Sequence, residues 1–490
     1  MLITRHEFLK RTGSYAGGLA ASLVFGRASR LLGQRGKRPN FVFILSDDMG
    51  WGDLPSFGHR SQIAYGGWIV RGELQMPNLD KMSRQGMRFT QFYEAQPVCS
   101  PSRCGLLTGQ FPNRLGIHDY LFTHELNKAR GMPDFLDPKT PTVTGLLQKS
   151  GYATAHFGKW HLGTIEQMGG AIGDPNTPKP EAYGIDKYDT GIHGPDGRVR
   201  SSEVIADETI EFIEKNKDAS FYINTWVYDP HSPLHPTEEM MAPYKDLSPG
   251  WGDHKGALQV YYAVLTNLDK HIGRILDTLD RLRLSENTVV VFSSDNGPEN
   301  SIIPFTSHYG GAPSVGPFRG EKRSLYEGGI RLPLIVQWPG KVPAGKVDNS
   351  TVIGGVDYLP TVCHLAGVEL PAKAAFDGED VSGAFLGRPI IRKKPLMWEW
   401  REPVYGSILN NAPMLAIREG KWKLLMNPDR SRIELYDIPS DPSEVDNLAD
   451  REPAVVRRLS RQVLAWQMTL PKGPVDPEAG KKNYPWPRNY

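Results

Sequence analysis

The chain has 490 residues, and its apolar, charged, glycine and proline contents are those of an ordinary globular enzyme. This length predicts one large domain with a smaller one. The formal net charge of +2 excludes a strong general attraction to nucleic acid or to an anionic membrane surface. The three cysteines, Cys99, Cys104 and Cys363, are too few for a disulfide framework.

The N-terminal segment has the order of an export signal. Residues 4–11 are basic, and a mild apolar run follows at residues 15–25. The segment resembles a twin-arginine signal, with His6 in place of the second arginine. A disordered tail is the alternative. We expect residues 1–35 to be an export signal and linker, the protein to be periplasmic or extracellular, and no stable membrane span, because the apolar run is short and glycine-rich.

Apolar runs and helical patterns alternate along most of the chain. In chain order they predict a strand at 40–46, helices at 76–86, 142–150 and 203–216, a strand at 220–227, a helix at 256–284 and a strand at 288–294. This alternation indicates an α/β fold, with a doubly wound, mostly parallel sheet flanked by helices. Two of the strands end in Asp47–Asp48 and Asp295–Asn296. Ligand sites of such folds lie beyond the carboxyl ends of the strands, so both pairs are expected at one crevice.

The C-terminal part follows a different pattern. It predicts short strands at 396–400, 414–417, 421–426 and 433–436 and then a helix at 453–468. These elements indicate a small antiparallel sheet with one helix. We therefore expect an α/β domain over residues 36–387, followed by an α+β subdomain and tail over residues 388–490.

The two polar pairs at the strand ends suggest a metal site. Asp47, Asp48, Asp295 and Asn296 offer only oxygen ligands, which Ca²⁺ and Mg²⁺ prefer, whereas zinc favours histidine and cysteine. Residues of these types also cap helices and form turns. The residue types alone leave both interpretations open.

A cysteine-containing segment is the most specific feature of the sequence. Residues 99–103 read Cys-Ser-Pro-Ser-Arg, and residues 107–109 read Leu-Thr-Gly. By physical argument alone, Cys99 could be a thiolate activated by Arg103, or a small buried residue before a turn. The pattern Cys-x-Pro-Ser-Arg followed by Leu-Thr-Gly resembles the signature of type I sulfatases of the alkaline phosphatase superfamily, such as arylsulfatases and N-acetylgalactosamine-6-sulfatases.

Further segments carry the same resemblance, in the order that the family has. They are Asp-Asp-Met-Gly-Trp-Gly-Asp at 47–53, Gly-Lys-Trp-His-Leu-Gly at 158–163, Pro-His-Ser-Pro at 230–233, Ser-Asp-Asn-Gly at 294–297 and Tyr-Glu-Gly-Gly-Ile-Arg at 326–331. The resemblance extends from Pro39 to about Leu386 and is highly specific because several independent segments agree.

The resemblance implies a sulfuric ester hydrolase that acts on sulfate monoesters. It implies that a formylglycine-generating or equivalent maturase oxidises Cys99 to formylglycine. The residues implied to hold Ca²⁺, or alternatively Mg²⁺, are Asp47, Asp48, Asp295, Asn296 and the modified Cys99. Arg103 would orient the aldehyde hydrate, and the residues implied to surround the sulfate are Lys159, His161, His231 and Lys322.

These roles are chemically coherent. One hydroxyl of the hydrated aldehyde, activated by Ca²⁺ and Asp295, would attack sulfur, and His231 would protonate the leaving oxygen. His161 would then take a proton from the second hydroxyl as the aldehyde reforms. Lys159 and Lys322 would neutralise charge on the sulfonyl oxygens.

Neighbouring residues add local expectations. Alternation along residues 153–161 predicts an extended segment with Lys159 and His161 on one face. His235 is expected in a solvated loop, because nearby prolines exclude a helix that could pair it with another histidine. Arg323 could share the role of Lys322.

Two other functions remain open on the sequence alone. One is a phosphate or phosphonate monoester hydrolase of the same superfamily, and the other is an inactive carbohydrate-binding relative. The complete motifs favour sulfate, and we expect a sulfated saccharide as substrate and no nucleic-acid partner. Candidates for sugar recognition outside the shared motifs are His118, Asp119, Arg198, Arg200, Trp398 and Trp400, of which the two tryptophans are equally expected in a core.

Overall fold

The central sheet is built around strand β1, Asn40–Ser46, which is buried along its whole length. The computed structural model describes residues 38–58, 63–65, 68–70, 74–163, 177–193, 197–247, 256–299, 312–404 and 407–481. Val42 and Ile44 of β1 enter one hydrophobic core, whereas Phe41, Phe43 and Leu45 enter another. Because successive side chains of a strand point to opposite faces, a strand with an unbroken apolar run, as from Phe41 to Leu45, must be covered on both sides.

Within the described ranges, this sheet has nine strands in the order β10-β4-β9-β8-β1-β7-β5-β6, with β11 beside β4. Their bounds are Met87–Tyr93 for β4, Ala153–Gly158 for β5, Lys187–Asp189 for β6, Phe221–Trp226 for β7, Thr288–Ser294 for β8, Arg331–Gln337 for β9, Val347–Asp348 for β10 and Ile353–Gly354 for β11. Strand β9 runs antiparallel to β4 and β8, and the other pairs are parallel. The predicted mostly parallel sheet is confirmed.

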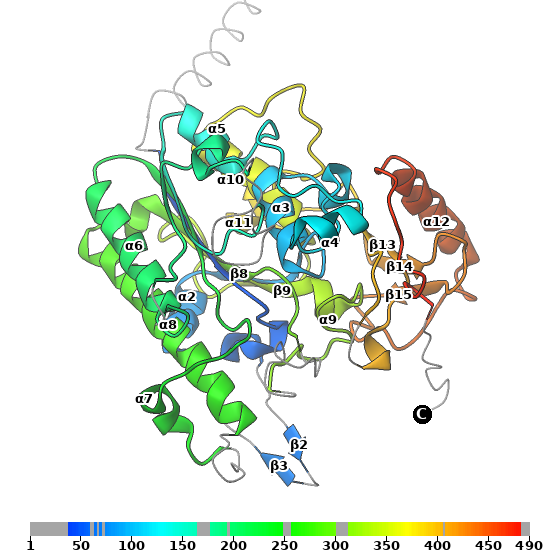
Figure 1. Cartoon of the computed structure of the whole chain (residues 1–490), viewed down its shortest axis with the longest axis horizontal. Coiled ribbons are helices and arrows are strands. Elements are labelled where there is room, and N and C mark those ends of the chain that lie inside the picture. The colour runs from blue at the N-terminus through cyan, green and yellow to red at the C-terminus, as the bar shows by residue number, and fades with distance from the viewer. Residues whose placement is uncertain are drawn as a thin grey trace, which may run out of the picture. The chain divides into compact units, whose positions relative to one another are not determined.

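Helices cover both faces of the sheet (Figure 1). Helices α2 (Pro77–Gln85), α6 (Ser201–Lys215) and α8 (Ala257–Arg281) pack into the core on one face. Helices α3 (Cys99–Thr108), α5 (Val143–Lys149) and α10 (Tyr358–Ala366) pack into the core on the other. The doubly wound arrangement and the predicted helices at 76–86, 142–150, 203–216 and 256–284 are thus confirmed to within a few residues.

Helix α3 was not predicted from the sequence, although it carries the cysteine motif. It contains Ser100, Pro101, Ser102 and Gly105, which are weak helix formers, and all its residues are buried. A helix that is buried all round shows no amphipathic period. Its stability therefore depends on tertiary packing, which local patterns do not reveal.

A second sheet lies near the C-terminus, as predicted. Its antiparallel strands are β12 (Leu396–Glu399), β13 (Leu415–Glu419), β14 (Trp422–Met426) and β15 (Glu434–Asp437), and helix α12 (Pro453–Gln467) packs with them into a third core. The described residues from Pro39 onward form one compact unit. A domain boundary at residue 388 stays a prediction.

The predicted export signal at residues 1–35 lies outside the described residues. Among the helices that the structure describes, none is long and apolar enough to cross a membrane.

Candidate active site

The site forms at the edge of the sheet where its parallel strands end. Asp47 and Asp48 follow β1, and Asp295 and Asn296 follow β8. Cys99 lies in the segment after β4, Lys159 in the segment after β5 and His231 in the segment after β7. Strand β9 is antiparallel, so its start lies at this same edge. The segment before β9 therefore brings Lys322 to residues that are far away in the sequence.

The two polar pairs lie side by side, as the strand pattern predicted. Ser46 of β1 pairs with Ser294 of β8, so the residues that follow each strand are neighbours. The backbone N–H of Asp48 donates to Oδ1 of Asp295 at 3.2 Å. Nδ2 of Asn296 donates to Oδ1 of Asp48 at 2.6 Å. These contacts connect both pairs in one crevice.

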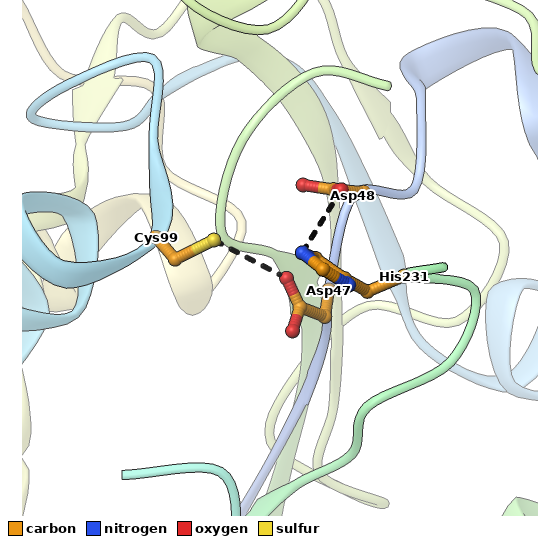
Figure 2. A group of neighbouring side chains, drawn as sticks. All are labelled: Asp47, Asp48, Cys99 and His231. Atoms are coloured by element: carbon orange, nitrogen blue, oxygen red, sulfur yellow. Dashed lines mark hydrogen bonds and ion pairs between the residues drawn. The ribbon is translucent and has the colours of Figure 1, made fainter. Parts of the chain in front are cut away.

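Cys99 is the first residue of helix α3, and its Sγ lies 3.5 Å from Oδ1 of Asp47. Asp47, Asp48, Cys99 and His231 form a group whose potential ligand atoms lie within 4.8 Å of one another (Figure 2). Burial, together with the charge of Asp47, raises the pKa of Cys99 to about 12. The unmodified thiol is therefore protonated near neutral pH, which argues against the interpretation of Cys99 as an activated thiolate.

Arg103 lies one turn after Cys99 on α3 and is completely buried. Its Nε and Nη2 donate to Oδ2 of Asp295 at 3.0 and 2.7 Å. Its Nη1 donates to the backbone carbonyl of Lys159 at 2.7 Å. Arg103 thus connects helix α3 with the segments that follow β8 and β5, and its charge is directed at Asp295 rather than at the thiol.

Two lysines contact the paired aspartates. Nζ of Lys159 lies 2.5 Å from Oδ2 of Asp47, and Nζ of Lys322 lies 2.7 Å from Oδ2 of Asp48. Both lysines line a cavity of about 300 Å³ that Cys99 also lines. Two positive charges beside a prospective nucleophile suit an anionic substrate group.

The prediction that residues 153–161 stay extended is wrong at the C-terminal end. Strand β5 ends at Gly158, where φ is 101°, and His161 has a φ of 55°. A Cβ atom at Gly158 would lie 1.9 Å from the carbonyl oxygen of Trp226, so this close approach requires glycine. Lys159 and His161 still line one cavity, but a turn rather than strand alternation brings them there.

The two predicted histidines also line this cavity, in different environments. Nε2 of His161 lies 3.0 Å from the carbonyl oxygen of Leu121, which requires Nε2–H as donor, and the buried Nδ1 has no hydrogen-bond partner among the described residues. Burial lowers the pKa of His161, so its ring is neutral and Nδ1 carries a lone pair.

His231 is held by both its ring and its backbone. Its Nδ1 lies 2.6 Å from the carbonyl oxygen of Ser232, and its Nε2 lies 3.7 Å from Oδ2 of Asp48. Nη2 of Arg198 donates to the carbonyl oxygens of Tyr228 and His231. Desolvation lowers the pKa of His231 below its usual value, and an anionic ligand in the cavity would raise it again.

The residues proposed for sugar recognition mostly lie elsewhere. Trp398 and Trp400 belong to the C-terminal core, which confirms one of the two placements considered for them. His118 and Asp119 are buried and are not among the residues that line the cavity. Arg200 pairs with Glu203 on the surface of α6. None of these five residues is among those that line the cavity, and their contact with a sugar stays a prediction.

Two aromatic residues that do line the cavity were missed. Tyr120 and Phe122 directly follow the buried Asp119. Their only signal in the sequence is the spacing of two aromatic residues around Leu121, which is too common to single them out. Arg323 lines the cavity as well. It pairs with Glu299, whereas Lys322 pairs with Asp48, so Arg323 and Lys322 have separate partners.

The donor set fits a hard divalent cation. Oδ1 of Asn296 is buried and has no hydrogen-bond partner among the described residues, although its Nδ2 donates to two oxygens. A buried, unpaired amide oxygen beside the carboxylates of Asp47 and Asp48 is a site that a cation would complete. Oxygen donors dominate the crevice, which favours calcium or magnesium over zinc.

Known proteins resemble this chain over most of its length. The Sulfatase family model matches residues 39–368, and the model for the N-sulphoglucosamine sulphohydrolase C-terminal region matches residues 318–468. N-acetylgalactosamine-6-O-sulfatase of Bacteroides thetaiotaomicron is 27% identical over 87% of this chain and 93% of its own. The canine N-acetylgalactosamine-6-sulfatase is 32% identical over 72% of this chain and 68% of its own.

The solved structures agree in fold. The crystal structure of Ps i-CgsB in complex with k-i-k-neocarrahexaose matches 89% of this chain and 94% of its own, with a TM-score of 0.71 and 23% identity. The crevice at the carboxyl edge of the parallel strands belongs to a doubly wound α/β fold. The chain belongs to the sulfatase family and is a sulfuric ester hydrolase. These matches do not favour the phosphate or phosphonate alternative.

Proposed function

We propose that this sulfatase removes sulfate from sulfated carbohydrates, with a formylglycine made from Cys99 as nucleophile and Ca²⁺ as cofactor. The observation that carries the proposal is the position of Cys99, 3.5 Å from Asp47 at the start of α3, in the same cavity as Lys159 and Lys322. A saccharide substrate is supported by the relatives, which are named as N-acetylgalactosamine-6-sulfatases.

The oxygen donors of the crevice would hold the cation. Its ligands would be Asp47, Asp48, Asp295, Asn296 and the modified Cys99, with Mg²⁺ as a possible replacement for Ca²⁺. The bound cation would supply positive charge that stabilises the sulfate oxygens and lowers the pKa of a nearby hydroxyl.

The protein's own side chains would bind the sulfate and move the protons. Lys159 and Lys322 would bind the sulfonyl oxygens through charge-assisted hydrogen bonds. Asp295 accepts two hydrogen bonds from Arg103, and we propose that it takes the proton of the attacking hydroxyl as the new bond to sulfur forms. As the sulfur–ester oxygen bond breaks, His231 would protonate the leaving oxygen.

Release of sulfate requires a second proton transfer. A hydrated aldehyde carries two hydroxyl groups, so one can attack sulfur. The other later loses its proton as the carbonyl reforms, and the bond between the same carbon and the sulfated oxygen breaks to release sulfate. Nδ1 of His161 is the proposed acceptor, because it lines the cavity on a neutral ring. The completeness of this set also disfavours an inactive carbohydrate-binding relative.

Mass spectrometry and kinetics test the nucleophile. A peptide spanning residues 98–103 should have the mass of an aldehyde at position 99 and should react with carbonyl reagents. Cys99→Ala should lower sulfatase activity by about four orders of magnitude, as deletion of a nucleophile does. The control is Cys104→Ala, a thiol of the same helix that faces the apolar core. Full activity of a preparation whose residue 99 is an unmodified thiol would refute the proposal.

We also propose export and a two-part chain. The basic and apolar pattern of residues 1–35 supports an export signal, with residues 36–387 as the catalytic domain and residues 388–490 as the smaller subdomain. Cell fractionation tests export: the mature protein should lie outside the cytoplasm and should lack part of the N-terminal segment. A full-length chain found wholly in the cytosol would contradict it.

A further inference from the structure

The cavity that Cys99, Lys159 and Lys322 line is also lined by an aromatic pair and an ion pair. Tyr120 and Phe122 line it together with Glu299 and Arg323. We propose that these four residues, here called the ring subsite, bind the sugar ring that carries the sulfate and favour an uncharged ring over a uronate. This inference rests on the proposed function, because it deepens the description of the same site.

The backbone of the aromatic pair is fixed to the catalytic machinery. The N–H of Leu121, which lies between the two aromatic residues, donates to Oγ of Ser100 at 3.0 Å. The carbonyl oxygen of Leu121 accepts from Nε2 of His161 at 3.0 Å. Tyr120 and Phe122 are therefore held at a set distance from the neighbour of Cys99, as a subsite for the group next to the sulfate requires.

The aromatic pair is also held from the outer side. The rings of Tyr120 and Phe122 meet edge to face, with centroids 6.1 Å apart. The guanidinium of Arg130 lies 4.7 Å from the centroid of Tyr120, and the N–H of Phe122 donates to Oδ1 of Asn127 at 2.9 Å. These contacts limit the motion of both rings before any ligand binds, which lowers the entropic cost of binding.

Phe122 is the exposed member of the pair, with 41% of its surface accessible. An exposed aromatic ring at a cavity that already holds anion-binding groups offers apolar surface that a ligand can cover. The C–H face of a pyranose is such a partner, because it presents apolar surface to the ring while its hydroxyl groups remain at the edge. Apolar contact with a few directed polar groups is the usual composition of a ligand pocket.

The ion pair decides the charge of the ring that fits. Arg323 pairs with Glu299, and their side chains are 14% and 6% exposed. The carboxylates of Asp119 and Asp48 also act on Arg323, and each has a cation of its own: Arg130 lies 2.8 Å from Asp119 and Lys322 lies 2.7 Å from Asp48. The charge of Arg323 is thus compensated inside the protein. A uronate at this position would meet the carboxylate of Glu299, whereas sugar hydroxyl groups can donate to it.

The test compares three sulfate esters: a hexopyranoside monosulfate, a hexuronate monosulfate with the sulfate at the same ring position, and 4-nitrophenyl sulfate. The wild-type enzyme should have the higher kcat/KM for the neutral sugar. Glu299→Gln removes the opposing charge, so the ratio of kcat/KM for uronate to that for neutral sugar should rise by about tenfold. The control Glu419→Gln, which breaks an exposed ion pair with Arg458, should leave the ratio unchanged.

The aromatic part is tested separately. Phe122→Ala should raise KM for the neutral sugar by about tenfold with little change in kcat, because it removes contact with the ring but not with the sulfate. Phe122→Tyr keeps the ring and should keep the wild-type KM. An unchanged ratio in Glu299→Gln, or an unchanged KM in Phe122→Ala, would overturn the inference. If a formylglycine-containing wild-type enzyme hydrolyses none of the three esters, the proposed function itself fails.

Discussion

Nζ of Lys423 on β14 lies 2.9 Å from a carboxylate oxygen of Glu327, and both side chains are completely buried. Glu327 begins helix α9, Glu327–Ile330, which follows the segment that carries Lys322. Lys423 also lies 2.8 Å from Glu444, whose Oε2 accepts from the backbone N–H of Glu327. The C-terminal sheet therefore supports the active-site segment through a buried charge cluster.

This cluster predicts a large and specific loss of stability. Lys423→Met would leave Glu444 buried without this cation, while Glu327 would keep Arg331 at 3.1 Å, and the free energy of unfolding should fall by about 3–5 kcal/mol. The matched control is Lys421→Met. The side chain of Lys421 is 54% exposed, so its ion pair with Asp437 should contribute less than about 1 kcal/mol to the free energy of unfolding. Chemical denaturation of both variants measures the difference. Equal losses of unfolding free energy in the two variants would contradict the prediction that the buried ion pairs stabilise the fold more than the exposed one.

The oxygen-rich crevice predicts one tightly bound Ca²⁺ per chain. Chelation should abolish sulfatase activity, and added Ca²⁺ should restore it. Asn296→Ala should weaken calcium binding, measured by titration calorimetry, because Oδ1 of Asn296 is a buried oxygen without a partner among the described residues. Asn216→Ala, at the end of helix α6, is the control and should bind calcium normally. Stoichiometric zinc with no calcium or magnesium in the active protein would contradict this prediction.

The proposed role of His231 predicts a dependence on the leaving group. His231→Ala should slow hydrolysis of sugar sulfates by about 100-fold, because a sugar alkoxide needs a proton as it leaves. Hydrolysis of 4-nitrophenyl sulfate, whose leaving group is stable as an anion, should change much less. His235→Ala removes an exposed histidine of the same loop and should affect neither substrate. Equal losses on both esters would leave His231 with a role in sulfate binding only.

We expect the Cys99→Ser variant to fail at the release of sulfate rather than at the attack on sulfur. The serine hydroxyl could still attack sulfur, but it offers no second hydroxyl from which a carbonyl could reform. Cys99→Ser should therefore turn over at most once and retain covalent sulfate at residue 99, which intact-mass measurement would detect. Cys99→Ala, prepared and treated in the same way, should gain no mass. Continuous turnover by Cys99→Ser at the wild-type rate would refute the proposed release step.

Sequence patterns went far in defining the fold because the signals are local. Strand β1 is apolar from Phe41 to Leu45 and strand β8 from Val289 to Phe292. The polar pairs directly follow these strands, so their meeting at one crevice could be predicted. Strand β9 was not predicted, and Pro333 within it interrupts the usual strand pattern. Its antiparallel direction, which brings Lys322 to the site, depends on pairing with β8 and β4.

The sequence by itself determined the alternation of strands and helices, the order of the motifs and the oxygen-rich donor set around Asp47. Only the tertiary structure decided that the chain turns at Gly158, that Phe122 lines the cavity and that Lys423 supports Glu327. The physical reason is that sequence patterns report only on interactions between residues close together in the chain. Strand and helix periods repeat over a few residues, whereas these contacts join segments whose spacing in the chain carries no period and whose partners are set only when the layers pack.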